Sequence, residues 1–149
     1  MDSIIFSAKP TMAKVADAIS HLGEHKELYW EVGFSIDRDK FTFPMLGFIH
    51  ICGEHVEYKV TIQEIVPFST EHYKRPLAES IKPEVWIREW EQNEKNVQEY
   101  SWKNVFVITK IEPFSFDTFA FLKYSDRQRL KKAPQSYTRV LLPENNDHC

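Results

Sequence analysis

The residues between 45 and 66 constrain the fold more than any other part of the sequence. Met45–Cys52 is almost continuously apolar, and Val56–Val66 alternates between apolar and polar residues for much of its length. Both patterns are typical of β-strands. Gly53 and Glu54 lie between the two runs and supply a tight turn, so this region is predicted to form a β-hairpin.

Other apolar segments predict strands on either side of this hairpin. They span residues 3–9, 28–34, 102–111 and 137–142. Aromatic residues make up 14% of the chain and are spread along it. Bulky rings pack well on a pleated surface, so this composition favours a sheet-rich architecture.

Helices are predicted at three places, and residues 67–82 are expected to be a long loop. Thr11 offers an N-cap to the first helix, because apolar residues then recur at the spacing of one helical face. These residues are Met12, Val15, Ala16, Ile19 and Leu22. Pro83 begins a second helix through Glu94, and Asp117 caps a short third helix that contains Phe119 and Leu122.

These elements predict an α+β fold in which helices flank five or six mostly antiparallel strands. Such an order suits a small, partly open β-barrel better than a doubly wound sheet. The length of 149 residues is that of a single domain. From about residue 143 the chain is expected to be a polar tail.

The sequence favours a cytoplasmic protein with no membrane partner. It has no run of about 18 apolar residues that would span a bilayer. The first ten residues lack the basic leader and long apolar core of a secretion signal. The cysteines, Cys52 and Cys149, do not suggest a disulfide framework.

No catalytic, cofactor-binding or metal-binding constellation is evident. The four glycines do not occur at the spacing of a dinucleotide or P-loop motif. His50, Cys52 and His55 give only three grouped ligands, whereas a structural zinc site needs four. We therefore predict that the protein has no cofactor and no metal. A binding protein is a better fit to this sequence than an enzyme. A small base-modifying enzyme remains an alternative, which requires ionisable groups that converge in a pocket.

Positive charge is concentrated near the end of the sequence. Residues 123–139 contain six basic residues and one acid, a net charge of +5, so the remainder carries -8 against an overall -3. Such a stretch next to an aromatic residue and an amide is suited to contacts with phosphates and bases. The predicted phosphate-binding residues are Lys123, Arg127, Arg129, Lys131, Lys132 and Arg139. The alternative is a solvated loop, which runs of charge usually form.

Three segments together resemble the PUA-like superfamily, and within it the EVE and YTH domains. Residues 29–32 (YWEV) are similar to the tyrosine-tryptophan strand that opens many EVE domains. The hairpin 47–51 (GFIHI) and 56–62 (VEYKVTI) is similar to the central strand pair of these families. Residues 102–107 (WKNVFV) resemble their later strand with a leading tryptophan. The sequence lacks a counterpart of the tryptophan-bearing loop that normally follows the first barrel strand.

The resemblance implies a domain that binds DNA or RNA and accepts a base, often a methylated one, in a pocket lined by aromatic rings. Domains similar to this one serve as DNA-reading modules of McrB-type restriction systems. The candidate rings are Trp30, Trp102 and Tyr137, although any single ring is more often part of the core.

A rival prediction is a protein-interaction module. Trp86 and Trp90 lie four residues apart on the second predicted helix. Two indoles at this spacing usually dock a helix onto a sheet. If they are exposed instead, they mark a surface for a protein partner.

Overall fold

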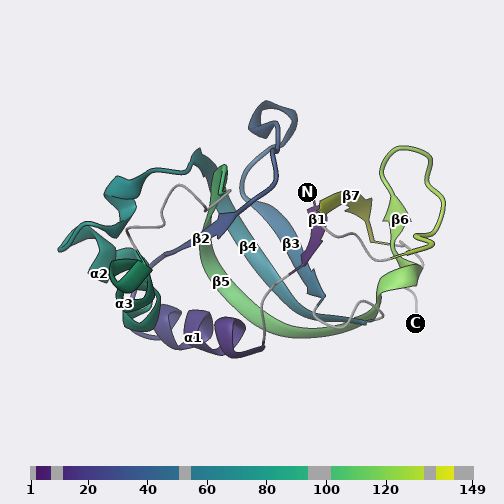
Figure 1. Ribbon diagram of the computed structural model, residues 1–149. Helices are drawn as coiled ribbons and strands as arrows, with labels where there is room; N and C mark the ends of the chain where they lie inside the picture. Colours follow the sequence, from purple (N-terminus) through teal and green to yellow (C-terminus); the bar gives the residue numbers. More distant parts are fainter. Residues whose placement is uncertain (1–2, 8–11, 51–54, 94–101, 133–136, 143–149) are drawn as a thin grey trace.

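A computed structural model describes residues 3–7, 12–50, 55–93, 102–132 and 137–142. They form an α+β fold built on a seven-stranded sheet (Figure 1). The strands are β1 (Ser3–Ser7), β2 (Leu28–Val32), β3 (Met45–His50), β4 (His55–Pro67), β5 (Asn104–Asp117), β6 (Leu122–Lys123) and β7 (Tyr137–Leu141).

The sheet has the order β2-β5-β4-β3-β1-β7-β6. Strands β1 and β3 are parallel, and the other neighbours are antiparallel. The mostly antiparallel α+β fold is therefore confirmed, with more strands than predicted. Among the described residues no pairing joins β2 to β6, so the sheet is open at these two ends.

Strand β1 links the two halves of the sheet. It pairs with β3 on one side and with β7 on the other, and the Ser3 hydroxyl donates a buried hydrogen bond to the Val140 carbonyl oxygen at 2.7 Å. Strands β7 and β6 are thus attached to the rest of the sheet through β1.

The helices lie together at the end of the molecule that carries β2 (Figure 1). They are α1 (Met12–Leu22), α2 (Leu77–Ile81) and α3 (Glu84–Asn93). In α1 the buried residues include Val15 and Ala18, whereas Ala16 and Ile19 are exposed. The predicted helix is confirmed, but its apolar face is rotated from the predicted one, because Ala18 packs in the core beside Val15 while Ala16 and Ile19 face solvent.

Apolar side chains pack on both faces of the sheet. In β1, Ile4 and Phe6 belong to a large cluster with α1 and α3, whereas Ile5 belongs to a smaller cluster on the other face. This alternation follows from the two-residue repeat of a strand. The smaller cluster includes Phe121, Leu130 and Val140, so it supports the region around β6 and β7.

The predicted hairpin is present, and Met45 of β3 pairs with Ile62 of β4. Its predicted turn at Gly53 and Glu54 lies outside the described residues. Strand β5 does not end at Ile111 as predicted but continues to Asp117. Pro113 is tolerated there because β2 reaches only as far as Ile108 on β5, so the later part of β5 is an edge.

Two other predictions need correction. The segment after Asp117 is a short 3-10 helix, η4 (Thr118–Ala120), and Leu122 belongs to β6. Asp117 does cap it, since its side chain accepts a hydrogen bond from the Phe119 N–H at 2.8 Å. The predicted loop 67–82 contains α2 and a 3-10 helix, η2 (Thr70–Tyr73). A further 3-10 helix, η1 (Arg38–Lys40), precedes β3.

Candidate functional site

Residues 121–132 form a β-hairpin, here called the basic hairpin, at the end of the molecule away from the helices (Figure 1). The Lys123 N–H donates to the Gln128 carbonyl oxygen at 2.8 Å, and the Leu130 N–H donates to the Phe121 carbonyl oxygen at 3.0 Å. Phe121 and Leu130 are buried and fix the base of the hairpin. At the turn, Arg127 has a left-handed backbone with a φ of 62°.

Strand β7 lies beside the basic hairpin. Lys123 pairs with Val140, and the Tyr124 N–H donates to the Arg139 carbonyl oxygen at 3.0 Å. The predicted phosphate-binding residues therefore share one region, here called the basic corner. It comprises Lys123, Arg127, Arg129, Lys131 and Lys132 on the hairpin and Arg139 on β7.

The cations of the basic corner differ in their contacts. Lys123 forms an ion pair with Asp126 at 3.4 Å, and Arg129 Nε donates to the Phe119 carbonyl oxygen at 2.8 Å. A second group of three is exposed, with no carboxylate of the described residues at ion-pair distance. This group is Arg127, Lys131 and Lys132. It gives the corner a local positive potential that a polyanion would neutralise.

Aromatic rings adjoin the same cations. The guanidinium carbon of Arg139 lies 3.7 Å from the centroid of the Tyr124 ring and 4.9 Å from that of Phe41. Tyr137 is two residues before Arg139 and so lies on the same face of β7. Its ring is 5.0 Å from that of Phe34. The rings of Tyr124 and Phe41, which lie in two different loops, thus contact Arg139 of β7. The ring of Phe34 contacts Tyr137 of the same strand.

The three rings predicted to bind a base do not share one pocket. Trp30 is only 1% exposed and packs edge-on against Phe6 and Trp86. Its position in the core leaves it no surface for a ligand, which corrects the prediction for this residue. Tyr137 packs instead against Phe34 near the basic corner.

Trp102 belongs to a third group of rings, near the start of β5. Its ring centroid lies 5.5 Å from that of Phe68, 6.2 Å from that of Tyr73 and 6.1 Å from that of Trp90. Tyr73 and Trp90 are stacked with centroids 4.1 Å apart, so these two rings fill the space between them. No base fits between rings at that separation.

The tryptophans of α3 hold this helix against the sheet. Trp86 is 9% exposed and Trp90 is 8% exposed. Trp86 meets Trp30 edge-on at 5.8 Å, while Trp90 stacks on Tyr73. The helix-docking interpretation is therefore confirmed, and little indole surface is left for a protein partner.

A buried charged group also lies near the helices and was not predicted. Lys82 Nζ donates hydrogen bonds to the carboxylate of Glu31 and to the carbonyl oxygen of Tyr29, and the Tyr73 hydroxyl donates to the same carboxylate. The side chains of Lys82 and Glu31 are 0% and 2% exposed. A single glutamate in the otherwise apolar strand 28–32 was the signal in the sequence.

The environment of Glu31 keeps it ionised. Burial by itself would raise the pKa of this carboxyl group. The charge of Lys82 and the hydrogen bonds from Lys82 and Tyr73 outweigh burial, so the pKa lies below its usual range. This group is fully paired inside the protein, which is the arrangement of a structural ion pair.

A hollow of about 470 Å³ lies between α1 and the α2–α3 segment. Its wall carries several carboxylates, together with His21, His25 and Lys82. The carboxylates are those of Asp17, Glu24, Glu79 and Glu84. An excess of negative charge makes this hollow unsuitable for a phosphate group.

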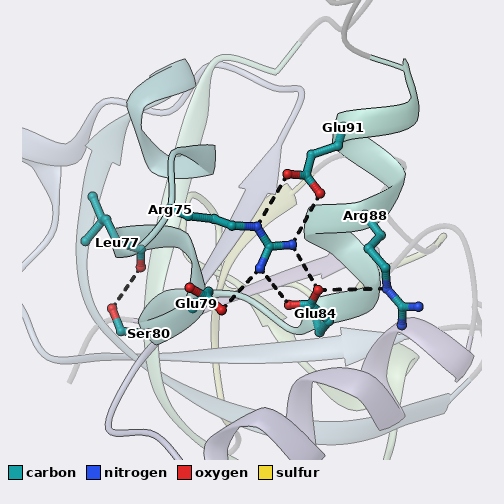
Figure 2. A network of polar contacts seen from close by, with 7 residues as sticks. All are labelled: Arg75, Leu77, Glu79, Ser80, Glu84, Arg88 and Glu91. Atoms are coloured by element: carbon teal, nitrogen blue, oxygen red, sulfur yellow. Dashed lines mark hydrogen bonds and ion pairs between the residues drawn. The ribbon is translucent and has the colours of Figure 1, made fainter.

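Arg75 connects the segment before α2 to α3 through carboxylates (Figure 2). Its guanidinium nitrogens lie 3.2 Å from Glu79, 2.9 Å from Glu84 and 3.2 Å from Glu91. All four side chains are at least one-third exposed. Here the positive charge is exposed but matched by nearby acids.

Neither a family model, a curated protein nor a solved structure matches this chain. Across the described residues no helix combines the length and the apolar character needed to cross a bilayer. In the same part of the chain no three His, Cys, Asp or Glu side chains are grouped as metal ligands. Cys52, one of the ligands considered from the sequence, lies outside the described residues.

Proposed function

We propose that this protein binds nucleic acid through the basic corner, with Arg127, Lys131 and Lys132 contacting phosphates. The supporting observation is that these cations are exposed on one hairpin, without carboxylate partners among the described residues. Neutralising phosphates with such cations releases counterions, which is the main source of affinity in sequence-independent binding. The hollow near the helices is lined by carboxylates that disfavour phosphate, which also points to the basic corner as the binding surface.

A relation to the PUA-like superfamily belongs to this proposal. The hairpin β3–β4, the later strand β5 and the mixed sheet are features that such a fold would have. Recognition of a methylated base stays a prediction of the resemblance. If it occurs, a surface other than Trp30 must accept the base, because that ring is in the core.

The proposal is tested by reversing the three unmatched cations. The variant combines Arg127→Glu, Lys131→Glu and Lys132→Glu. Its matched control makes the same charge change near the helices, with Lys26→Glu, Lys74→Glu and Arg88→Glu, which are also exposed. Fluorescence anisotropy with labelled oligonucleotides is measured between about 50 and 200 mM salt.

The wild-type protein should bind less tightly as salt rises. The corner variant should lose about 100-fold or more in affinity at low salt. The slope of log affinity against log salt should fall by about two to three, since each lost phosphate contact removes about 0.7 to 0.9. The helix-end control should keep most of the affinity. Equal binding by the corner variant and the wild type would refute the proposal, as would equal losses in the two variants.

A further inference from the structure

We infer that the basic corner takes single-stranded nucleic acid and that an unpaired base stacks on the outer face of Tyr124. This inference rests on the proposed function and specifies the form of its ligand. It depends mainly on the placement of one exposed ring, which was not among the candidate rings named from the sequence.

Tyr124 is held in place although it is exposed. It is the first residue of the hairpin turn, its N–H donates to the Arg139 carbonyl oxygen at 3.0 Å, and the residue is 44% exposed. The guanidinium of Arg139 covers one face of the ring at 3.7 Å from the centroid. A ring that is already oriented loses less freedom on binding than a mobile one.

The second face of the Tyr124 ring is suited to a nucleobase. A planar guanidinium on one face and a base on the other form a continuous stack, and stacking accepts any base because every base has a π-face. Removal of such a ring commonly weakens binding by about 5- to 150-fold. The ring therefore offers affinity without sequence preference.

The cations and rings around Tyr124 fit the strand on either side of that base. Arg127 lies in the same turn, and Lys131 and Lys132 follow the returning strand. Phe41 lies across Arg139, and the Phe34–Tyr137 pair lies on the same face of β7. An alternation of positive charge with ring surface is the arrangement by which proteins follow a single strand.

A duplex cannot use this ring in the same way. Its base faces are covered by stacked neighbours, so a base must be unstacked before it reaches Tyr124. The duplex retains phosphate contacts with the cations but not the ring contact. Single strands should therefore bind more tightly than duplexes at equal salt.

The experiment compares four labelled probes of about 12 nucleotides, a length within the site sizes of single-strand binders. They are single-stranded DNA, single-stranded RNA, a DNA duplex and a DNA strand of the same length without bases. Each is titrated against the wild type, Tyr124→Ala and Tyr124→Phe by fluorescence anisotropy. Circular dichroism checks that the variants are folded.

We expect the wild type to bind at least one single strand about 10-fold or more tighter than the duplex or the strand without bases. Tyr124→Ala should lose about 10-fold in affinity for that single strand and little in affinity for the duplex and the strand without bases. Tyr124→Phe should bind all probes like the wild type. The DNA and RNA probes identify the polymer, and a preference for either supports the inference.

The outcomes separate this inference from the proposed function. Equal binding of single strand, duplex and base-free strand by the wild type would overturn the stacked base but leave phosphate binding intact. This result needs no variant, so it does not depend on how Tyr124→Ala folds. Failure of every probe to bind would overturn both proposals.

Discussion

Positive charge is held in opposite ways at the two ends of this molecule. Near the helices, Lys82 is completely buried against Glu31 and Tyr73. In the basic corner, Arg127, Lys131 and Lys132 are exposed and have no acidic partner among the described residues. The first arrangement connects strand β2 to the helical segment, whereas the second leaves its charges exposed to solvent.

The difference shows which charges serve stability and which are available to a ligand. A charge taken out of water must be compensated within the protein, or the folded state loses several kcal/mol. An exposed cation remains hydrated, so its lack of a partner has little effect on folding. Three predictions test this contrast, from the largest expected effect to the smallest.

Replacing Lys82 should have the largest effect. Lys82→Met leaves the Glu31 carboxylate buried without its main partner, and we expect a loss of about 3 to 5 kcal/mol in the free energy of unfolding. Urea denaturation followed by circular dichroism measures this loss. Glu31→Leu combined with Lys82→Met should recover much of it, because neither charge of the pair is then buried without the other. If Lys82→Met alone proves as stable as the wild type, the Glu31–Lys82 pair does not support the fold.

Acidification should have a smaller effect through the same pair. Because the pKa of Glu31 is lowered in the folded state, its contribution is complete above the ordinary glutamate pKa of about 4.3. It is lost as the pH falls through the lowered folded value. From about pH 7 to about pH 3, the melting temperature of the wild type should therefore fall more than that of the Glu31→Leu, Lys82→Met variant. Parallel curves would assign the acid sensitivity to other carboxylates.

Arg75→Ala should have the smallest effect, and it separates pairing from burial. Arg75 contacts three carboxylates, but it and its partners are 35% to 54% exposed. Exposed ion pairs gain little because water and salt screen them. In the same urea experiment, the loss should be a small fraction of that caused by Lys82→Met. A comparable loss would mean that matched charge, buried or exposed, determines stability here.

The parts of the fold that could be predicted are those that produce a repeating pattern among residues close together in the sequence. Apolar alternation identified the β3–β4 hairpin, and helical spacing identified α1 and α3. The cations of residues 123–132 lie on one hairpin because they are close in the sequence. Strand β6 has two residues and α2 has five, which is too short for a repeating pattern to emerge.

Contacts between distant residues account for what was missed. Glu31 and Lys82 are 51 positions apart, and neither residue type by itself indicates burial. Trp30 was predicted to face a ligand because an aromatic side chain gives the same signal in a core as in a pocket. The stack of Tyr124 on Arg139 depends on the pairing of β6 with β7. Because β6 was not predicted from the sequence, this stack could not be predicted either.

The bond between Ser3 and Val140 has a consequence for biosynthesis. Strand β1 and β7, its neighbour on one side, are translated more than a hundred residues apart, since the two bonded residues are 137 positions apart. Contacts of such long range form late and expose unpaired strand edges in the meantime. A product that stops before β7 therefore lacks the strand on which the basic hairpin rests.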